Sequence, residues 1–265
     1  MELQSRYSDL QARGIGLAVV TYDSTDTLKR FADARGIEFP LLSDSGSETI
    51  KRYGLLNREM DPTSRFAGVP YPGTFILDMN GRVQDRAFLR AYQERLTVAT
   101  IAVRLADPID GTDRNVTRVE TDHLEALVWV TDGAVAPGNR FALVADVTPK
   151  PNMHVYAPGD HDYPVIQFRM DAPEFLRNHE AIYPSPQTYY FEPLDETVPV
   201  YEEPFRLVQD VTIPMSPEIE TLAAEPGATV VLKGVLAYQA CDSEVCYVPA
   251  EVPLSWELTW RPLVR

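Results

Sequence analysis

Residues 238–247 read YQACDSEVCY and contain both cysteines of the chain, Cys241 and Cys246. Apolar or alternating segments flank the pair, TVVLKGVLAYQA on one side and VPAEVPLSWELTW on the other. Two such segments joined by a short polar loop predict a β-hairpin. Cysteines that flank a four-residue loop face each other across the hairpin, and their Cβ atoms then come within about 4 Å with ease. The stretch therefore predicts a paired-cysteine hairpin within a strand-rich fold.

The two thiols have three interpretations: a redox-active pair, a structural disulfide, or free thiols and a metal half-site. A disulfide here closes a small ring, so its chain-entropy contribution is only about 2 kcal/mol, which is little for a domain with a full apolar core. Two thiols also fall short of the four ligands of a structural zinc site. The acidic neighbours Asp242 and Glu244 disfavour a free thiolate, so the pair needs a partner for activation. We favour the redox-active pair and expect no metal; the other two interpretations stay open.

The region from about residue 116 onward has no long helical period, and Pro, Gly, Asp and Asn punctuate its short segments. Seven or more short strands at this spacing predict an antiparallel β-sandwich. The segments are LEALVWVTDG, RFALVADVTP, NMHVYAPG, YPVIQFRM, FRLVQDVTIP, TVVLKGVLAYQA and VPAEVPLSWELTW. The acidic, Pro- and Gly-containing stretch DPIDGTDRN (107–115) reads as a linker. We predict two domains, residues 1–107 and 119–265, with a linker at 108–118.

Residues 1–107 alternate helical and strand patterns, which indicates an α/β domain. The expected order is helix, strand, helix, helix, strand, strand, helix, and QERLTVATIAVRLAD forms the last helix. The helix TDTLKRFADARG has Ser24 or Thr25 as its N-cap and ends at Gly36. The turn MNGR contains Asn-Gly, so residues 73–89 predict a hairpin.

Composition excludes several classes of protein. The net charge of −15 argues against nucleic acid and anionic membranes as partners, since both bind cationic surfaces. No run of 18 apolar residues exists, so we expect no membrane span. The opening MELQSRYSDL is charged and shows no secretory signal.

The first half resembles the thioredoxin-like redoxins of the alkyl hydroperoxide reductase/thiol-specific antioxidant type, on the stretch GVPYPGTFILDMNG and the segments around it. The resemblance covers about residues 1–105 and implies that Pro72 is the cis-proline beside a redox site. Such domains begin with a strand and a loop that bears the reactive cysteine, whereas residues 1–240 contain no cysteine. We expect that Met1 is an internal residue of a longer reading frame; a degenerate, structural redoxin is the alternative. Peroxidase activity is not expected for this chain.

The second half resembles the N-terminal immunoglobulin-like domain of the thiol:disulfide interchange protein DsbD, over about residues 120–260. The resemblance rests on NMHVYAPGDHDYPVIQF, YEEPFRLVQDVTIP and above all YQACDSEVCYVP. Four residues separate the cysteines, one fewer than in the best-known member of the family.

This resemblance implies a set of site residues around a catalytic Cys241–Cys246 pair. Tyr238, Gln239 and Tyr247 match the cysteine motif. A cap loop with Phe191 or Tyr190 shields the disulfide. The supporting residues are Tyr238, Gln239, Tyr247, His154, Tyr156, Phe191 and Tyr190. His154 either tunes thiolate charge or packs at a strand end.

The function expected from both halves is thiol–disulfide exchange without a cofactor. Its partner is a thioredoxin-like protein or a membrane thiol–disulfide reductant. The alternative is a non-catalytic interaction module with a structural disulfide on a degenerate redoxin scaffold. The expected location is periplasmic or extracytoplasmic if the true start lies upstream, and cytoplasmic if Met1 is genuine.

Overall fold

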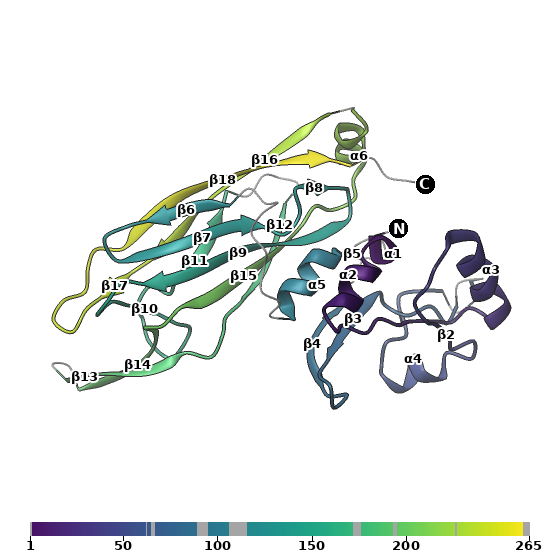
Figure 1. Ribbon diagram of the computed structural model, residues 1–265, viewed down its shortest axis with the longest axis horizontal. Helices are drawn as coiled ribbons and strands as arrows, with labels where there is room; N and C mark the ends of the chain where they lie inside the picture. The colour runs from purple at the N-terminus through teal and green to yellow at the C-terminus, as the bar shows by residue number, and fades with distance from the viewer. Residues whose placement is uncertain are drawn as a thin grey trace. The chain divides into compact units, whose positions relative to one another are not determined.

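The computed structural model describes residues 2–61, 63–64, 67–88, 95–105, 116–171, 176–192, 195–225 and 227–261. By its internal contacts the chain separates into two compact units, Met1–Val98 and Ala99–Arg265 (Figure 1). The first unit mixes helices and short strands and the second is rich in strands, as the sequence predicts. The predicted linker falls largely on residues 106–115, outside the described residues.

The first unit holds four helices and five strands among its described residues. They are α1 (Glu2–Ser5), α2 (Tyr7–Ala12), β1 (Val19–Thr21), α3 (Thr25–Arg35), β2 (Leu41–Ser43), α4 (Glu48–Arg52), β3 (Gly73–Leu77), β4 (Val83–Phe88) and β5 (Arg95–Leu96). β1 and β2 pair in parallel, with α3 as the crossover between them. The Ser24 side chain accepts a hydrogen bond from the Thr27 N–H, and Gly36 ends α3 with φ 61°. Both predicted ends of this helix are confirmed.

The predicted hairpin at the Asn-Gly turn is also confirmed. β3 and β4 pair antiparallel, and the Asp78 carboxylate accepts hydrogen bonds of 2.8 Å from the N–H groups of Asn80 and Arg82. Gly81 adopts φ 76°, a conformation that the turn requires and that suits glycine. Val20 of β1 and Leu42 of β2, which face each other in the register, remain 50% and 49% exposed.

The peptide bond before Pro72 is trans, which corrects the prediction of a cis-proline there; no described peptide bond is cis. Just before it, Tyr71 N–H donates to the Leu55 carbonyl at 2.7 Å, and Leu56 forms a bridge with Pro70. This pairing carries the chain extended into β3. A trans bond continues such a path and is also the form that X–Pro bonds prefer.

The second unit consists of two helices and thirteen strands within its described residues. They are α5 (Val98–Arg104), β6 (Thr117–Glu120), β7 (Leu124–Val130), β8 (Ala134–Val135), β9 (Asn139–Pro149), β10 (His154–Tyr156), β11 (Gln167–Met170), β12 (Arg177–Ile182), β13 (Gln187–Phe191), β14 (Glu196–Tyr201), β15 (Phe205–Thr212), α6 (Pro217–Ala224), β16 (Thr229–Tyr238), β17 (Ala240–Cys241) and β18 (Ala250–Trp260). The sequence analysis did not predict α6, which Ser216 caps by accepting from the Ile219 N–H.

Two sheets of the second unit enclose its core. One has the strand order β12-β15-β9-β7-β6 and the other β11-β16-β18-β8 (Figure 1). Strand β18 alternates buried and exposed residues, because side chains of a strand point to opposite faces in turn, whereas β9 and β15 are buried along most of their length. The shared core includes Leu143 and Leu207 from one sheet and Leu232 and Trp256 from the other. This packing of two sheets is the sandwich that the sequence predicts.

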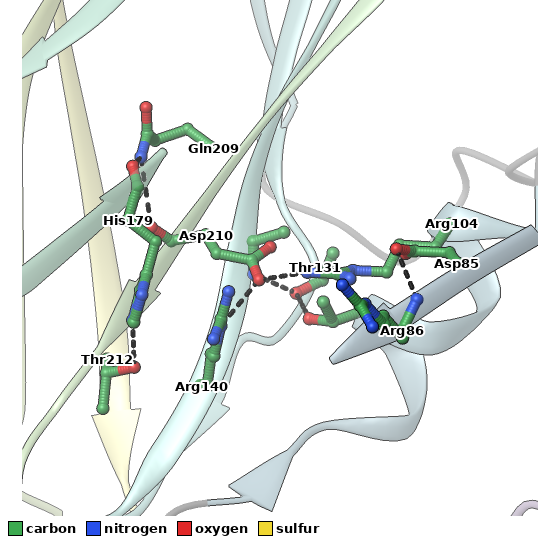
Figure 2. Close-up of polar contacts among 11 residues, drawn as sticks. Asp85, Arg86, Arg104, Thr131, Arg140, His179, Gln209, Asp210 and Thr212 are labelled. Atoms are coloured by element: carbon green, nitrogen blue, oxygen red, sulfur yellow. Dashed lines mark hydrogen bonds and ion pairs between the residues drawn. The ribbon is translucent and has the colours of Figure 1, made fainter. Parts of the chain in front are cut away.

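Helix α5 groups with the second unit, although the sequence analysis placed it at the end of the first half. Its Arg104 binds Asp210 of β15, which also accepts a 2.7 Å hydrogen bond from Arg140 (Figure 2). Arg104 and Asp210 are 5% and 1% exposed, so this is a buried ion pair. Nearby, the hydroxyls of Thr100 on α5 and Thr131 lie 3.1 Å apart. These polar contacts tie the helix to the sheet.

A third sheet, with strand order β13-β14-β10-β17, carries Cys241. β17 is the short continuation of the long strand β16, and it pairs with β10 so that Cys241 lies opposite His154. The chain at the end of the β16–β18 hairpin therefore also pairs with a strand of the third sheet. This third sheet fixes the backbone of Cys241 independently of any bond between the sulfur atoms.

Candidate functional site

Cys241 and Cys246 form a disulfide, with their Cα atoms 4.1 Å apart. The two residues also form an isolated antiparallel β-bridge across the loop between them. The prediction that the cysteines face each other across a hairpin is confirmed. The site is therefore a disulfide at the tip of a long hairpin.

The two sulfur-bearing residues differ sharply in their exposure. Cys241 is 1% exposed and belongs to a small apolar cluster with Tyr156, Val198 and Val200. Cys246 is exposed, as are the three residues that precede it, 243–245. Solvent and any partner thus meet the disulfide from the Cys246 side.

The loop between the cysteines is held by hydrogen bonds of its own. The Asp242 carboxylate accepts hydrogen bonds of 2.8 Å from the N–H groups of Glu244 and Val245. The Tyr247 hydroxyl donates to the same carboxylate, also at 2.8 Å. These three donors lower the pKa of Asp242, those of the loop N–H groups most. A charged Asp242 therefore organises the loop whether or not the sulfurs are bonded.

The motif residues outside the loop hold its base. The Gln239 side chain donates to the Tyr247 carbonyl at 2.9 Å, and the Tyr247 N–H donates to the Ala240 carbonyl at 2.9 Å. Tyr238 is 2% exposed, and its hydroxyl donates to Thr121 at 2.8 Å. All three matched motif residues thus support the hairpin, and within the described residues none of them forms a hydrogen bond or ion pair with a sulfur atom.

Tyr156 is the site residue whose hydroxyl reaches the sulfurs. Its oxygen lies 3.2 Å from Cys241 Sγ and 3.3 Å from Cys246 Sγ. Its ring stacks on that of Tyr163, with centroids 4.3 Å apart and planes at 6°. The Tyr163 hydroxyl in turn donates to Glu196 at 2.6 Å. Burial, with smaller contributions from Tyr163, Glu196 and Tyr189, raises the pKa of Tyr156 to about 12.

His154 lies beside the site and is 3% exposed. Its ring packs on Tyr189, with centroids 4.3 Å apart, and edge-on to Tyr156 at 5.8 Å. Burial lowers the pKa of His154, and the nearby negative charge of Asp242 opposes this shift only in part. His154 is therefore neutral at pH 7 and a packed member of the site.

The aromatic residues predicted as a shield are not arranged as the sequence analysis expected. TYYF lies in strand β13, where alternate side chains point to opposite faces. Tyr190 is 56% exposed and its hydroxyl donates to Asp195, so it does not cover the disulfide. Tyr189, on the other face, packs against the apolar cluster that includes Cys241. Phe191 shares the face of Tyr189 but stands at the strand end, opposite Glu196.

Sequence reasoning missed Tyr163 and Glu196 as parts of the site, and it considered Tyr189 only as a member of the aromatic cluster in the cap loop. Tyr163 follows the turn APGDHD, whose His161 accepts a hydrogen bond from the Tyr163 N–H on Nδ1 at 3.2 Å. Tyr156 ends β10 and Tyr163 follows seven residues later, a spacing with no period that could have revealed the stacking of their rings. Asp242 was noticed, but for its charge and not for its role as an acceptor in the loop.

The third sheet and the loop between the cysteines contain acidic residues but no Lys or Arg. The acidic residues are Glu196, Asp242 and Glu244. Two exposed apolar residues flank Cys246, since Val245 is 51% and Val248 is 85% exposed. Within the described residues, no three metal-ligating side chains gather to hold an ion.

No helix in the described part of the chain has the length and apolar character needed to cross a bilayer.

Comparison with known proteins supports the assignment of the first unit. Residues 1–86 match the model of the AhpC/TSA family. Peroxiredoxin Q from the chloroplast of Sedum lineare is 32% identical over 78 residues, which cover 29% of this chain and 39% of the relative. The thiol-disulfide oxidoreductase ResA from Bacillus thuringiensis is 27% identical over 104 residues, which cover 36% of this chain and 51% of the relative. The chain thus spans about half or less of the length of these relatives.

Solved structures give weaker likenesses. The N-terminal domain of DsbD from Neisseria meningitidis, in its reduced form, is 14% identical with a TM-score of 0.31; the match covers 45% of this chain and 82% of that one. The N-terminal periplasmic domain of ScsB from Proteus mirabilis is also 14% identical, with a TM-score of 0.36 over 56% of this chain and 51% of that one. The AhpC/TSA match is confined to residues 1–86, and both cysteines of the chain lie outside it, in the strand-rich second unit.

Proposed function

We propose that this chain performs reversible thiol–disulfide exchange through the Cys241–Cys246 pair. The observation that carries the proposal is the unequal exposure of the two cysteines, since Cys241 is 1% exposed whereas Cys246 is an exposed residue. An exchange reaction needs one sulfur that a partner can reach and a second that leaves and returns. A hairpin whose loop and base are hydrogen-bonded independently of the disulfide can keep its shape while that bond opens.

The exchange begins with attack by a partner thiolate on Cys246 Sγ. A sulfur–sulfur bond forms between the partner and Cys246, and the Cys241–Cys246 bond breaks, which leaves Cys241 as a thiolate. A second thiol of the partner then attacks its own sulfur in the mixed disulfide and releases Cys246. The partner ends as a disulfide and this pair as a dithiol, so two electrons have moved; the reverse sequence runs the same steps backward.

The partner we propose is a thioredoxin-like protein or a membrane-bound thiol–disulfide reductant. The redoxin segment contributes no thiol, because both cysteines lie at 241 and 246. The exposed Val245 and Val248 offer apolar contact beside Cys246, and the acidic residues around them favour a partner that is cationic near its reactive cysteine. An oxidising, extracytoplasmic compartment suits a chain whose disulfide is formed.

Single-cysteine variants test the proposal. In Cys241→Ser, the exposed Cys246 is expected to attack a thioredoxin whose resolving cysteine is removed and whose remaining cysteine carries thionitrobenzoate as a mixed disulfide; thionitrobenzoate leaves and a stable mixed disulfide forms between the two proteins. In Cys246→Ser, the buried Cys241 should form this adduct at least tenfold more slowly. Non-reducing electrophoresis and intact mass measure both. A reduction potential of the pair well below about −300 mV would instead assign it a structural role and refute the exchange function.

A further inference from the structure

The Tyr156 hydroxyl occupies a position that the proposed exchange makes chemically significant. It lies 3.2 Å from Cys241 Sγ and 3.3 Å from Cys246 Sγ, so it faces the bond that breaks and forms. A disulfide sulfur carries no hydrogen, and the hydroxyl must therefore be the donor in these contacts. With its pKa raised to about 12, Tyr156 keeps its proton over the whole physiological range.

Neighbouring residues hold this hydroxyl in place. The Tyr163 ring stacks on the Tyr156 ring, and the Tyr163 hydroxyl is anchored on Glu196 at 2.6 Å. His161 fixes the turn that leads to Tyr163, with Nδ1 accepting from the Tyr163 N–H and Nε2 lying 2.8 Å from the Ala157 carbonyl oxygen. A donor whose orientation is set before the reaction loses little entropy when charge develops on its acceptor.

We propose that Tyr156 is a catalytic residue that stabilises the Cys241 thiolate when the disulfide opens, by donating its O–H hydrogen bond to Cys241 Sγ. The inference rests on the proposed exchange function. When a partner thiolate bonds to Cys246 Sγ, the electron pair of the broken bond stays on Cys241 Sγ. The Tyr156 proton is shared with that sulfur but not transferred. The same hydrogen bond lowers the energy of Cys241 as the nucleophile in the reverse direction.

The size of the effect follows from the burial of Cys241. At 1% exposure the sulfur is out of reach of bulk water, and a buried charge without a hydrogen-bond donor is strongly disfavoured. Hydrogen bonds to charged groups contribute roughly twice as much as neutral ones. We expect loss of this donor to slow opening of the disulfide by about tenfold to a hundredfold.

Tyr156→Phe tests the inference, because it removes the hydroxyl and keeps the stacked ring. Its matched control is Tyr183→Phe, since Tyr183 is partly buried and also loses a hydroxyl hydrogen bond, to the Ile166 carbonyl at 2.8 Å. The first readout is the second-order rate of reduction by dithiothreitol. The second is the pKa of the Cys241 thiol, from thiolate absorbance in a Cys246→Ser background. A purely structural role for Tyr156 would leave the second readout unchanged.

The expected result is a reduction rate at least tenfold lower in Tyr156→Phe and a Cys241 pKa higher by about one unit, which corresponds to tenfold in thiolate population. Tyr183→Phe should match the unmodified chain in both. Unchanged rate and pKa in a folded Tyr156→Phe would overturn the inference. If that variant does not fold, Tyr163→Phe decides: it removes the hydrogen bond that anchors the stacked Tyr163 ring on Glu196, so the Tyr156 ring loses a fixed neighbour. Both readouts should shift in the same direction as in Tyr156→Phe, and no shift refutes the inference. Failure of the unmodified disulfide to react at all would count against the exchange function itself.

Discussion

Reduction of the Cys241–Cys246 disulfide should destabilise the second unit only slightly. The cysteines are five positions apart, so the bond closes a very small ring. The chain-entropy relation then assigns it a contribution of about 2 kcal/mol, against nearly 5 kcal/mol for a loop of a hundred residues. A domain of this unit's size loses roughly 2–4 °C in melting temperature for each kcal/mol. We therefore expect reduction to lower the melting temperature by about 4–8 °C.

The structure gives a reason to expect the lower part of that range. The loop is already restrained by the Asp242 carboxylate and by the Tyr247 hydroxyl that binds it, and β17 stays paired with β10. Reduction therefore releases a segment that other bonds continue to hold.

Thermal unfolding by circular dichroism, with and without a non-thiol reductant such as a phosphine, measures the shift. Cys246→Ser is the matched control, because it removes the bond at the exposed position and leaves the buried Cys241 in place. It should melt within about 2 °C of the reduced, unmodified chain. A fall of more than about 15 °C, or loss of folding on reduction, would refute this reasoning and favour the structural disulfide.

Three further outcomes follow from the structure. Asp210→Ala leaves Arg104 and Arg140 without their shared carboxylate, so we expect the free energy of unfolding to fall by about 3–5 kcal/mol and the melting temperature by about 6–20 °C. Asp33→Ala, at an exposed ion pair, should shift the melting temperature by under about 3 °C. Equal shifts in the two variants would contradict this expectation. Because burial lowers the pKa of His154 below its usual 6.5, the folded state binds that proton less readily than the unfolded chain. The free energy of unfolding should therefore fall as the pH drops through 6.5 and level off below the lowered pKa. Urea midpoints measured between pH 8 and pH 5 should fall less steeply in His154→Phe, and equal slopes in the two proteins would count against this role of His154. At about 10 mM salt, the reduced pair should react severalfold faster with the cationic disulfide cystamine than with the anionic dithiodipropionate. The ratio of the two rate constants should approach one at about 1 M salt. A ratio that does not depend on salt would exclude electrostatic selection of partners.

The sequence predicted the features that depend on short-range rules. The Asn-Gly turn fixed the β3–β4 hairpin, Ser24 and Gly36 bounded α3, and the spacing of Cys241 and Cys246 predicted their pairing. Each of these depends on backbone conformations that a few neighbouring residues determine.

What escaped prediction depends on contacts between distant segments. The stacking of Tyr163 on Tyr156 and its anchor on Glu196 come from separate strands and loops. The unequal burial of the cysteines arises because β17 pairs with β10 while Cys246 lies beyond the sheet. The trans bond before Pro72 reflects its extended path, and only the pairing around residues 55–57 and 70–71 reveals that path.

The unequal exposure of the two cysteines also bears on oxidative damage. A peroxide that meets the reduced pair reaches Cys246 first and converts it to a sulfenic acid. Cys241, whose Cα lies 4.1 Å away in the bonded pair, then condenses with it and restores the disulfide, with loss of water. The irreversible sulfinic and sulfonic acids require a second oxidant molecule before that condensation. The buried Cys241 thus reverses the first oxidation of Cys246, and the pair should stay active at oxidant concentrations that inactivate a lone exposed thiol.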